Sequence, residues 1–411
     1  MKRIDTIIIG AGQAGLAMSR SLSDCCIPHV VFERGEVGNS WRHERWDSLR
    51  LLTPNWQSRL PGYSYSGANP EGYMSMPEIA GYLADYAKVS RAPVEENTRV
   101  LSVIPDGYGY AVANSRDTWR CNTLILASGA CNRASIPAFA SALPAGIDQV
   151  NGLTYRNPDQ LSDGGVLVVG ASATGVQLAS EIRASGREVF LSAGEHTRMP
   201  RWYRGHDIQW WMDEAGIHKT GIQQVDDVER VRRLPSLQLE GSRKHRFCDL
   251  NRLMSEGVEI VGRLSAVRDG QALFSGALAN HCALSDLKMN RLLDTLDAWA
   301  ESRSVNCVGP VERFAPTACP ALPRLSLDLN NGRIRTVVWA TGFKPDYDWL
   351  HLPVFDGKGR LIHNQGQVAP GLHVLGLPFQ RRRNSALIDG VGADAIALAN
   401  DIRFQHCLSV A

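Results

Sequence analysis

The glycines near the N-terminus have the clearest chemical use in this sequence. Residues Gly10-Ala11-Gly12-Gln13-Ala14-Gly15 follow the pattern G-x-G-x-x-G. In this pattern the first glycine permits a tight turn, the second lets the backbone approach a diphosphate, and the third lets a helix pack closely on a strand. The free N–H groups and positive dipole of a helix N-terminus then hold the diphosphate. Glu33, 18 residues after Gly15, is placed to accept hydrogen bonds from ribose hydroxyls.

The elements around this motif are those that a dinucleotide site requires. Residues 7–9 are three isoleucines, an apolar and β-branched run that predicts a buried parallel strand. Residues 16–23 continue with helical character, and residues 29–32 predict a second strand that ends at Glu33. A glycine-rich turn without a ligand is the alternative. It is disfavoured because strand, turn, helix and terminal acid occur together in the right order.

A second motif of the same kind begins at residue 170. Residues 166–169 predict a strand, and Gly170-Ala171-Ser172-Ala173-Thr174-Gly175 reads G-x-S-x-x-G. A helix from 176 to 184 then leads to a strand over 188–192. Ser172 replaces the middle glycine, which is tolerable if the diphosphate lies slightly further out. The sequence therefore predicts two dinucleotide sites in one chain.

The second site lacks the acid of the first. The position that matches Glu33 is Ser192 or Ala193. Four basic residues follow shortly: His196, Arg198, Arg201 and Arg204. A neutral strand end with nearby arginines accommodates a 2′-phosphate, which favours NADPH over NADH, although Glu195 lies close by.

Residues 34–62 depart from a plain nucleotide-binding unit because they contain three tryptophans, Trp41, Trp46 and Trp56. These rings could form a wall for a large flat ligand or a packed aromatic cluster. Residues 76–89 predict a helix with Pro77 at its first position. Arg381 to Arg383 could bind an acidic substrate, but a solvated loop is the favoured interpretation.

The remaining segments predict how the two sites are joined. Residues 134–165 have loop composition, and Asn330-Asn331-Gly332 predicts a hairpin between strands at 325–329 and 335–339. Residues 371–377 predict a strand that returns to the first unit, followed by a helix from about 386 to 404. We therefore expect an α/β fold of two nested Rossmann-like dinucleotide-binding domains, with boundaries at 1–155, 156–342 and 343–411.

Composition narrows the functional class. A net charge of +2 gives no argument for binding nucleic acid or a membrane surface, and no apolar run is long enough to span a bilayer. Nine cysteines form no C-x-x-C pair, which argues against a dithiol relay. Their odd number without a secretory signal predicts a reducing, cytoplasmic location. We find no Ser-His-Asp set, paired carboxylates or metal-ligand cluster, so the chemistry is expected to come from cofactors.

With these motifs in place, the chain resembles the class B single-component flavoprotein monooxygenases over nearly its whole length. Within them it is most similar to the bacterial CzcO/TrkA-type flavoproteins, which are related to plant auxin-synthesis and animal flavin-containing monooxygenases. The resemblance depends on GAGQAG with Glu33, G-N-S-W-R at 38–42, R-L-L-T-P at 50–54, Tyr155-Arg156, GASATG at 170–175, WATGF at 339–343 and PGLHVLGLPF at 370–379.

The resemblance implies a role for each matching residue. FAD is expected on Gly10, Gly12, Gly15 and Glu33, with Trp41 and Arg42 along its ribityl and isoalloxazine edge. NADPH is expected on Gly170, Ser172, Ala173, Thr174 and Gly175, with Arg198 or Arg201 at its 2′-phosphate. Ala340, Thr341 and Gly342 are expected to link the domains near both cofactors, and Asn55 is the candidate catalytic residue. The remaining expected cofactor-binding residues are Gln13, Ala14, Arg34, Ser40, Val100, Ala127, Ser192 and Gly376.

The resemblance implies an NADPH-dependent FAD monooxygenase. Such an enzyme moves one oxygen atom of O₂, through a C4a-(hydro)peroxyflavin, into a small organic substrate by N- or S-oxygenation or Baeyer–Villiger insertion. One departure is that the family fingerprint F-x-G-x-x-x-H-x-x-x-(Y/F) has Asn151 at its histidine position. An NADPH oxidase or quinone reductase, and a non-catalytic redox-sensing nucleotide-binding subunit, are therefore the alternatives. Members of this family commonly form dimers, so a homodimer is the expected assembly.

Overall fold

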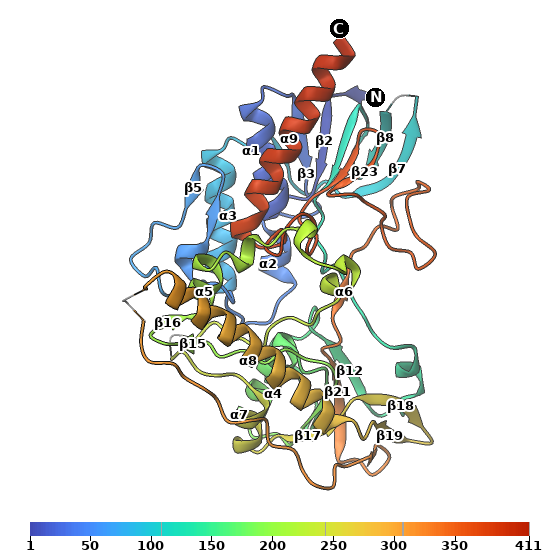
Figure 1. Cartoon of the computed structure of the whole chain (residues 1–411). Helices are drawn as coiled ribbons and strands as arrows, with labels where there is room; N and C mark the ends of the chain where they lie inside the picture. The colour runs from blue at the N-terminus through green and yellow to red at the C-terminus, as the bar shows by residue number, and fades with distance from the viewer. Residues whose placement is uncertain (108, 243, 306–307, 411) are drawn as a thin grey trace.

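The computed structural model describes residues 1–107, 109–242, 244–305 and 308–410, and it forms two lobes that each contain a mainly parallel sheet (Figure 1). The first sheet has the strand order β23-β24-β10-β2-β3-β6. Its strands are β23 (Gln367–Ala369), β24 (Leu372–Val374), β10 (Thr123–Leu126), β2 (Thr6–Ile9), β3 (His29–Phe32) and β6 (Val94–Glu95). Because β24 pairs in parallel with β10, both ends of the chain build this sheet, as the blue and red ribbons of the upper lobe in Figure 1 show.

The second sheet is all parallel and has the order β12-β21-β13-β14-β17. Its strands are β12 (Asp148–Asn151), β21 (Ile334–Trp339), β13 (Gly165–Val169), β14 (Val189–Ala193) and β17 (Glu259–Gly262). Strand for strand, this order repeats β24-β10-β2-β3-β6 of the first sheet. The predicted α/β fold of two nested dinucleotide-binding units, the second inserted in the first, is confirmed.

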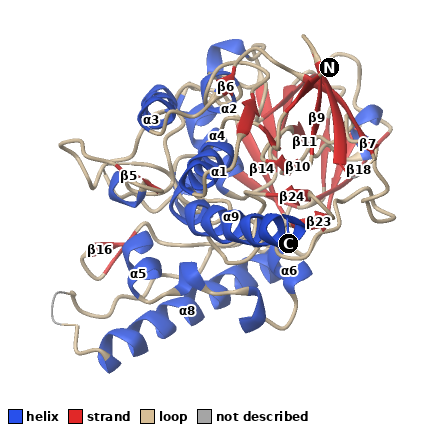
Figure 2. Cartoon of the chain, turned by 90° about the horizontal axis from the view of Figure 1, so that it is seen from above, coloured by secondary structure: helices blue, strands red, loops and turns tan. Residues whose placement is uncertain are grey.

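Side chains that alternate along the strands separate the two cores of the first lobe. Ile8 packs against α1 (Gln13–Asp24), α3 (Met76–Val89) and α9 (Ile388–Val410). Its neighbours Ile7 and Ile9 face a four-stranded sheet of β1 (Lys2–Arg3), β9 (Thr118–Cys121), β8 (Gly109–Asn114) and β7 (Val100–Asp106). Figure 2 shows α1 and α9 lying side by side against one face of the strands.

The second lobe repeats these layers. Val166 and Val168 pack against α4 (Ala173–Ala184) and α7 (Leu250–Ser255). Leu167 and Val169 face a small sheet of β18 (Leu264–Arg268), β19 (Gln271–Phe274) and β20 (Ser326–Asp328). A further core lies between α5 (Ile208–Glu214) and the long α8 (Leu278–Ser302), where Trp211 is fully buried.

The two crossings between the lobes run side by side. Strand β11 (Arg133–Ala134) pairs antiparallel with β22 (Phe343–Lys344), so the outgoing and returning chains form one ribbon. Thr341 Oγ1 donates to the Ser135 carbonyl at 2.6 Å, which fixes the predicted linker against the outgoing chain. Short helices and strands complete the chain: α2 (Asn39–His43), α6 (Val228–Arg232), β4 (Arg59–Leu60), β5 (Tyr63–Ser64), β15 (Trp202–Tyr203) and β16 (His206–Asp207). The 3₁₀ turns are Asn55–Gln57, Ala138–Ala142, Pro158–Gln160, Ile217–Lys219 and Ile222–Gln224.

Two local expectations differ from the structure. The predicted hairpin around 330–332 is wrong, because β20 pairs with β19 whereas β21 lies in the parallel sheet. The segment expected to be loop between 134 and 165 contains β12, which pairs with β21. Sheet membership therefore assigns β12 to the second unit, although it precedes the boundary expected at residue 155.

Candidate functional site

In the first glycine loop, close packing within the protein requires glycine at Gly10 and Gly15 but not at Gly12. A Cβ at Gly15 would lie 1.8 Å from the Gly10 carbonyl oxygen, and a Cβ at Gly10, where φ is +108°, would lie 2.5 Å from the Ala127 oxygen. A Cβ at Gly12 would meet no described atom within 4 Å. Packing thus demands glycine at two positions but leaves the space beside Gly12 open. This is the cradle that a diphosphate needs.

The N-terminus of α1 is also left open. Its N-cap is Gly12, no side chain caps it, and its first turn carries no acid. Helix α3, in contrast, begins with a full capping box of Ser75 and Glu78. The free N–H groups of α1 therefore point from the loop toward the predicted diphosphate position, where an anion would satisfy them.

Glu33 is held in place by the backbone at the end of β3. Its two carboxylate oxygens accept the N–H groups of Ala11 at 2.8 Å and Gly35 at 3.1 Å. Burial raises the pKa of Glu33, while these N–H groups act in the opposite direction. Next to it, Arg34 pairs with Glu44, the C-cap residue of α2. Glu33 is therefore an oriented carboxylate beside the first loop.

Several of the other residues expected at FAD converge on the start of α1. Trp41 Nε1 donates to Gln13 Oε1 at 3.3 Å, and Gln13 Nε2 donates to the Ala386 carbonyl at 3.5 Å. A Cβ at Gly376 would lie 2.8 Å from the Ala14 Cβ. The expected residues Ser40 and Arg42 lie with Trp41 in α2, and Val100 lies at the start of β7, where it is buried. The segment that leads into α9 thus closes over the first glycine loop.

Residues 55–58 and Asn384 carry several buried polar atoms that have no partner among the described residues. Asn55 Nδ2 donates to the Asn69 carbonyl at 2.9 Å, but its Oδ1 has no partner among the described residues. The same holds for both amide atoms of Gln57, Ser58 Oγ and Asn384 Oδ1. Arg59, next to Ser58, donates to Asp389 in the first turn of α9 at 2.6 Å. Buried polar atoms in native proteins are nearly always satisfied, so water or a bound ligand is expected to supply partners for these atoms.

Gln57, Ser58 and Asn384 are residues that the sequence interpretation missed. Their proximity to Asn55 and to the expected C-terminal helix was the available signal. Neutral amides and hydroxyls carry no distinctive spacing, so burial without partners had to be seen in the structure.

The second glycine loop repeats the backbone of the first. Gly170 has φ +111°, and its Cβ would lie 2.4 Å from the Ala340 oxygen; a Cβ at Gly175 would lie 1.8 Å from the Gly170 oxygen. Ser172, the N-cap of α4, has φ −82° and ψ −173°, and its side chain caps no N–H group. Ala173, Thr174 and Gly175 form the first turn of α4. The predicted linker residue Ala340 is therefore in direct contact with this loop.

Asn151 lies at this same end of the second sheet. Its Oδ1 accepts the Leu153 N–H at 2.9 Å, so it shapes the turn that leads to the fully buried Tyr155. A Cβ at Gly152, inside that turn, would lie 3.0 Å from the Phe343 ring and 3.4 Å from Thr174. The residue at the fingerprint histidine position thus supports a turn beside the second loop.

Ser192 does not offer its hydroxyl to a ligand. Its Oγ donates to the Gly262 carbonyl at 3.0 Å and accepts the Leu264 N–H at 2.8 Å, and the residue is 1% exposed. Gly170 N donates to the Ser192 carbonyl as Gly10 N donates to that of Phe32, so Ala193 is the counterpart of Glu33. The Ser192 side chain therefore braces β14 against β17 and β18.

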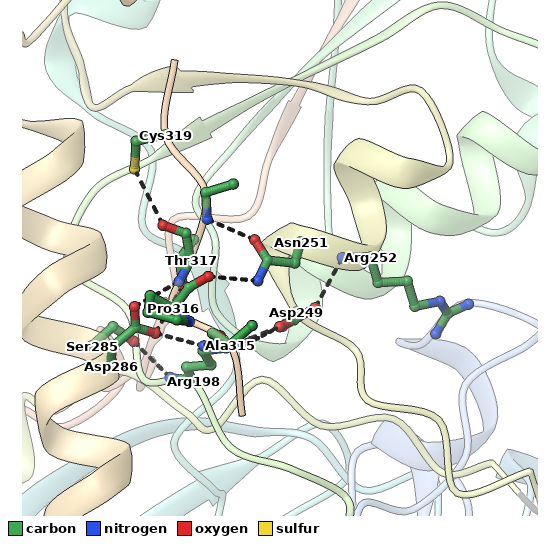
Figure 3. A network of polar contacts seen from close by, with 11 residues as sticks. Arg198, Asp249, Asn251, Arg252, Ser285, Asp286, Ala315, Pro316, Thr317 and Cys319 are labelled. Atoms are coloured by element: carbon green, nitrogen blue, oxygen red, sulfur yellow. Dashed lines mark hydrogen bonds and ion pairs between the residues drawn. The ribbon is translucent and has the colours of Figure 1, made fainter. Parts of the chain in front are cut away.

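The guanidinium groups of Arg198 and Arg201, both expected near a 2′-phosphate, are buried and ion-paired with aspartates. Figure 3 shows the network around Arg198. Arg198 donates to Asp249 at 2.6 and 2.9 Å and to Asp286 at 2.8 Å. Arg201 donates to Asp207 at 2.5 and 2.8 Å. Neither group is available to a 2′-phosphate in this structure.

Other positive groups lie around Glu195, just beyond β14. Lys288 of α8 donates to Glu195 at 2.8 Å, and this hydrogen bond is the main cause that lowers the pKa of Glu195. The charges of Arg230 and His281 lower it further. These groups place positive charge just beyond the end of β14.

Comparison with known proteins supports this arrangement. Residues 7–211 match the family model for pyridine nucleotide-disulphide oxidoreductases. A CzcO-like oxidoreductase of Geobacillus kaustophilus is 33% identical over 403 residues, which cover 97% of this chain and 98% of that protein. The probable indole-3-pyruvate monooxygenase YUCCA1 of Arabidopsis thaliana is 28% identical over 181 residues, 43% of this chain and 44% of that protein.

The fold is also similar to that of solved flavin monooxygenases. The flavin-containing monooxygenase of Stenotrophomonas maltophilia superposes with a TM-score of 0.69 at 18% identity, covering 99% of this chain and 100% of that structure. The fold and the two glycine loops thus define a class B flavin monooxygenase-like protein. Within that class, the chain belongs to the family of CzcO-like oxidoreductases. The predicted enzyme class and the prediction of FAD and NADPH are confirmed at the level of this class.

Two features are absent from the part of the chain that the structure describes. None of the described helices combines the length and the apolar character that crossing a bilayer requires. Within the same part of the chain, no three His, Cys, Asp or Glu side chains gather as a metal site would require. The expected dimer and the expected cytoplasmic location stay predictions.

Proposed function

We propose that this protein is an NADPH-dependent FAD monooxygenase that oxygenates a small organic molecule at a nitrogen or sulfur atom or inserts oxygen beside a ketone. The observation that carries the proposal is the pair of open glycine loops, at Gly12 and Ser172, joined by a linker that packs on the second of them. Bound FAD would supply hydride acceptance from NADPH and reaction with O₂.

The residues of the chain would then bind and orient. The free N–H groups of α1 and Gly12 hold the FAD diphosphate, and Glu33 accepts from its ribose. Asn55, Gln57 and Asn384 would supply buried hydrogen-bonding atoms to the flavin ring and to groups that become charged beside it during the reaction. The N-terminus of α4 at Ser172 holds the NADPH diphosphate.

The proposed division of the chain follows the sheets. Residues 1–155 and 343–411 are proposed to bind FAD and residues 156–342 to bind NADPH. Strand β12, near the end of the first range, is the exception because it pairs with β21 in the sheet of the NADPH unit. Lys288, Arg230 and His281 are the proposed surroundings of the 2′-phosphate, because they provide positive charge beyond β14.

The test is incorporation of labelled oxygen. Purified protein loaded with FAD is given NADPH, ¹⁸O₂ and, in turn, a thioether, a tertiary amine and a cyclic ketone. We expect one ¹⁸O atom in the product of at least one substrate, with hydrogen peroxide formed in smaller amount than NADPH consumed. NADPH consumption matched fully by hydrogen peroxide, with no labelled product, contradicts the monooxygenase proposal.

A second candidate, an NADPH oxidase, is favoured by one observation. Asn151 replaces the fingerprint histidine and is occupied in a turn through its Oδ1. The amounts of hydrogen peroxide and labelled product in the same experiment separate the two candidates. The Asn151→His variant is expected to lower the fraction of NADPH lost to hydrogen peroxide if Asn151 causes leakage.

A further inference from the structure

Arg201 lies where the inserted unit meets the segment that carries Asn55. It is fully buried, and its guanidinium group donates in three directions: to the Leu52 carbonyl at 2.7 Å, to Tyr73 Oη at 3.0 Å, and to Asp207. Leu52 and Tyr73 belong to the first unit, whereas Arg201 and Asp207 belong to the inserted region. One side chain therefore bonds across the junction.

The partners of Arg201 are bonded to one another as well. Tyr73 Oη donates to Asp207 Oδ2 at 2.5 Å, and the Arg201 guanidinium stacks on the Tyr73 ring with its carbon 4.4 Å from the ring centroid. Asp207 is 2% exposed, and its other oxygen caps α5 by accepting the Gln209 N–H at 2.7 Å. The group Arg201–Tyr73–Asp207, called here the junction triad, is closed to solvent.

The triad bonds to the segment that carries Asn55 and also to the backbone segment that pairs with it. Leu52 precedes Asn55 by three residues, and Asn55 N donates to the Gly72 carbonyl at 2.8 Å. Tyr73 follows Gly72 directly. Arg201 thus donates hydrogen bonds to Leu52 in one backbone segment and to Tyr73 in the segment paired with it.

The same region also reaches the segment before α9. Gln209 Oε1 contacts His218 Nε2 at 2.9 Å, and the His218 carbonyl accepts the Asn384 N–H at 3.1 Å. Asn55 and Asn384 are two of the residues with buried, unpartnered oxygens. The inserted unit therefore bonds to both segments, the one that carries Asn55 and the one that carries Asn384.

We propose that Arg201 is a positioning residue: through the junction triad, the NADPH unit fixes the Asn55 segment of the FAD unit in the geometry that the reaction needs. This inference rests on the proposed function. The planar guanidinium suits the task because it donates in several fixed directions at once, which an ammonium group cannot reproduce. Small misplacements of reacting groups are costly in rate, so a displaced Asn55 segment would slow turnover without removing either cofactor.

Arg198 provides a matched control. It is equally buried and ion-paired, but its partners Asp249, Asp286 and Ala315 all lie within the inserted region (Figure 3). Replacing Arg198 by lysine disturbs a network of similar size without touching the Asn55 segment. A merely structural role for Arg201 predicts that Arg201→Lys and Arg198→Lys behave alike.

The test compares FAD-loaded wild type, Arg201→Lys, Tyr73→Phe and Arg198→Lys by hydrogen exchange and by anaerobic reduction with NADPH. We expect Arg201→Lys to speed exchange in residues 50–58 by about tenfold, because the bonds that close this segment weaken. It should also lower the limiting reduction rate by about tenfold while changing the KM for NADPH less than about threefold, as a positioning role requires. Tyr73→Phe, which keeps the ion pair and the ring, should show the same pattern at about threefold.

Arg198→Lys should leave residues 50–58 and the reduction rate near wild type and speed exchange at 249–255 instead. Equal effects of the two lysine variants, or unchanged exchange at 50–58 in Arg201→Lys, would overturn the proposal. If Arg201→Lys does not fold, Tyr73→Phe against Arg198→Lys decides by the same criteria. If NADPH fails to reduce the wild type, the proposed function fails, while the exchange measurement still decides whether the triad holds the Asn55 segment.

Discussion

The two glycine loops have the same backbone but different side chains at the positions that a nucleotide would touch. The residues before the two helices, Gly12 and Ser172, have φ and ψ of −83° and −171° and of −82° and −173°. At both loops the last glycine is required by a carbonyl oxygen 1.8 Å from where its Cβ would lie. The requirement is thus set by the packing of helix on strand, which both units share.

The two loops differ at the positions that close packing within the protein does not constrain. The first loop has no side chain at its middle position and a fixed carboxylate, Glu33, at the end of β3. The second has a hydroxyl at Ser172 and a buried methyl at Ala193, surrounded further out by Lys288 and Glu195. Identical frames thus carry different side chains at the positions proposed to face the ligands, as two different dinucleotides would require.

The largest effect is expected from filling the shared packing contact. Gly15→Ala and Gly175→Ala should each destabilise their unit by about 3 kcal/mol or more. The added methyl group would overlap a backbone carbonyl oxygen, and the packing of the helix on the strand leaves no room to move it away. Denaturant unfolding of the FAD-free protein measures this. Gly81→Ala in α3, where a Cβ meets no described atom within 4 Å, is the control and should be neutral or slightly stabilising. A mild effect at only one of the two glycines would contradict the claim that the two units share this packing requirement.

This shared frame could be predicted from the sequence because it is local. Gly10 and Gly170 adopt positive φ within a turn whose residues are contiguous, and three isoleucines in a row have few places in a soluble fold other than a buried strand. The unpredicted strand β12 is the opposite case. It is short, polar and at a sheet edge, and only its pairing with β21 makes it a strand.

The buried ion pairs of the arginines could not be predicted for the same reason. The sequence shows charges near the end of β14, but the carboxylates that occupy Arg198 are 51 and 88 residues away. The hairpin signal at 330–332 failed similarly, because a turn motif does not specify which sheet the next strand joins. The backbone of the glycine loops depends on residues close in sequence and could be predicted. Which charged side chains are neutralised depends on partners far away in sequence and could not.

A second contrast between the units concerns β24 and its counterpart β12. His373 on β24 is 2% exposed, and its two ring nitrogens have no partner among the described residues. Burial lowers the pKa of His373 to about 4, with the charges of Asp401 and Arg381 acting in opposite directions. Strand β12 carries no histidine. The first sheet therefore has an acid-sensitive position that the second lacks.

The sign follows from the lowered pKa. The unfolded chain takes up the His373 proton near pH 6.5 and the folded chain only near pH 4, so this contribution to stability is complete above pH 6.5 and is lost as pH falls toward 4. Between pH 7 and pH 5 the loss should be about 2 kcal/mol. Denaturant unfolding at both pH values measures it for wild type and His373→Gln. An equal loss in the variant would assign the acid sensitivity to other groups.

Exchanging the middle residues of the loops tests whether they face ligands. Gly12→Ser should leave the stability of the FAD-free protein nearly unchanged, because no described atom lies within 4 Å of its Cβ, but weaken FAD binding about tenfold by occupying the diphosphate position. Ser172→Gly should change NADPH affinity less than threefold. Equilibrium titration followed by flavin fluorescence and by NADPH fluorescence gives both values. If Gly12→Ser destabilises the protein without FAD but binds FAD normally, then the open space is not a ligand cradle.

The smallest effect is expected at the residues that distinguish the second site. Lys288→Gln removes the positive charge that contacts Glu195, and should raise the KM for NADPH by roughly fivefold while leaving that for NADH unchanged, since only NADPH carries the 2′-phosphate. Glu195→Gln removes the competing carboxylate and should shift the ratio of the two KM values in the opposite direction. Arg198→Lys, whose charge is already neutralised by two buried aspartates, should leave the ratio as in the wild type. A change in the ratio with Arg198→Lys but not with Lys288→Gln would return the 2′-phosphate to the arginine that the sequence first indicated, and would require the buried network of Figure 3 to open when NADPH binds.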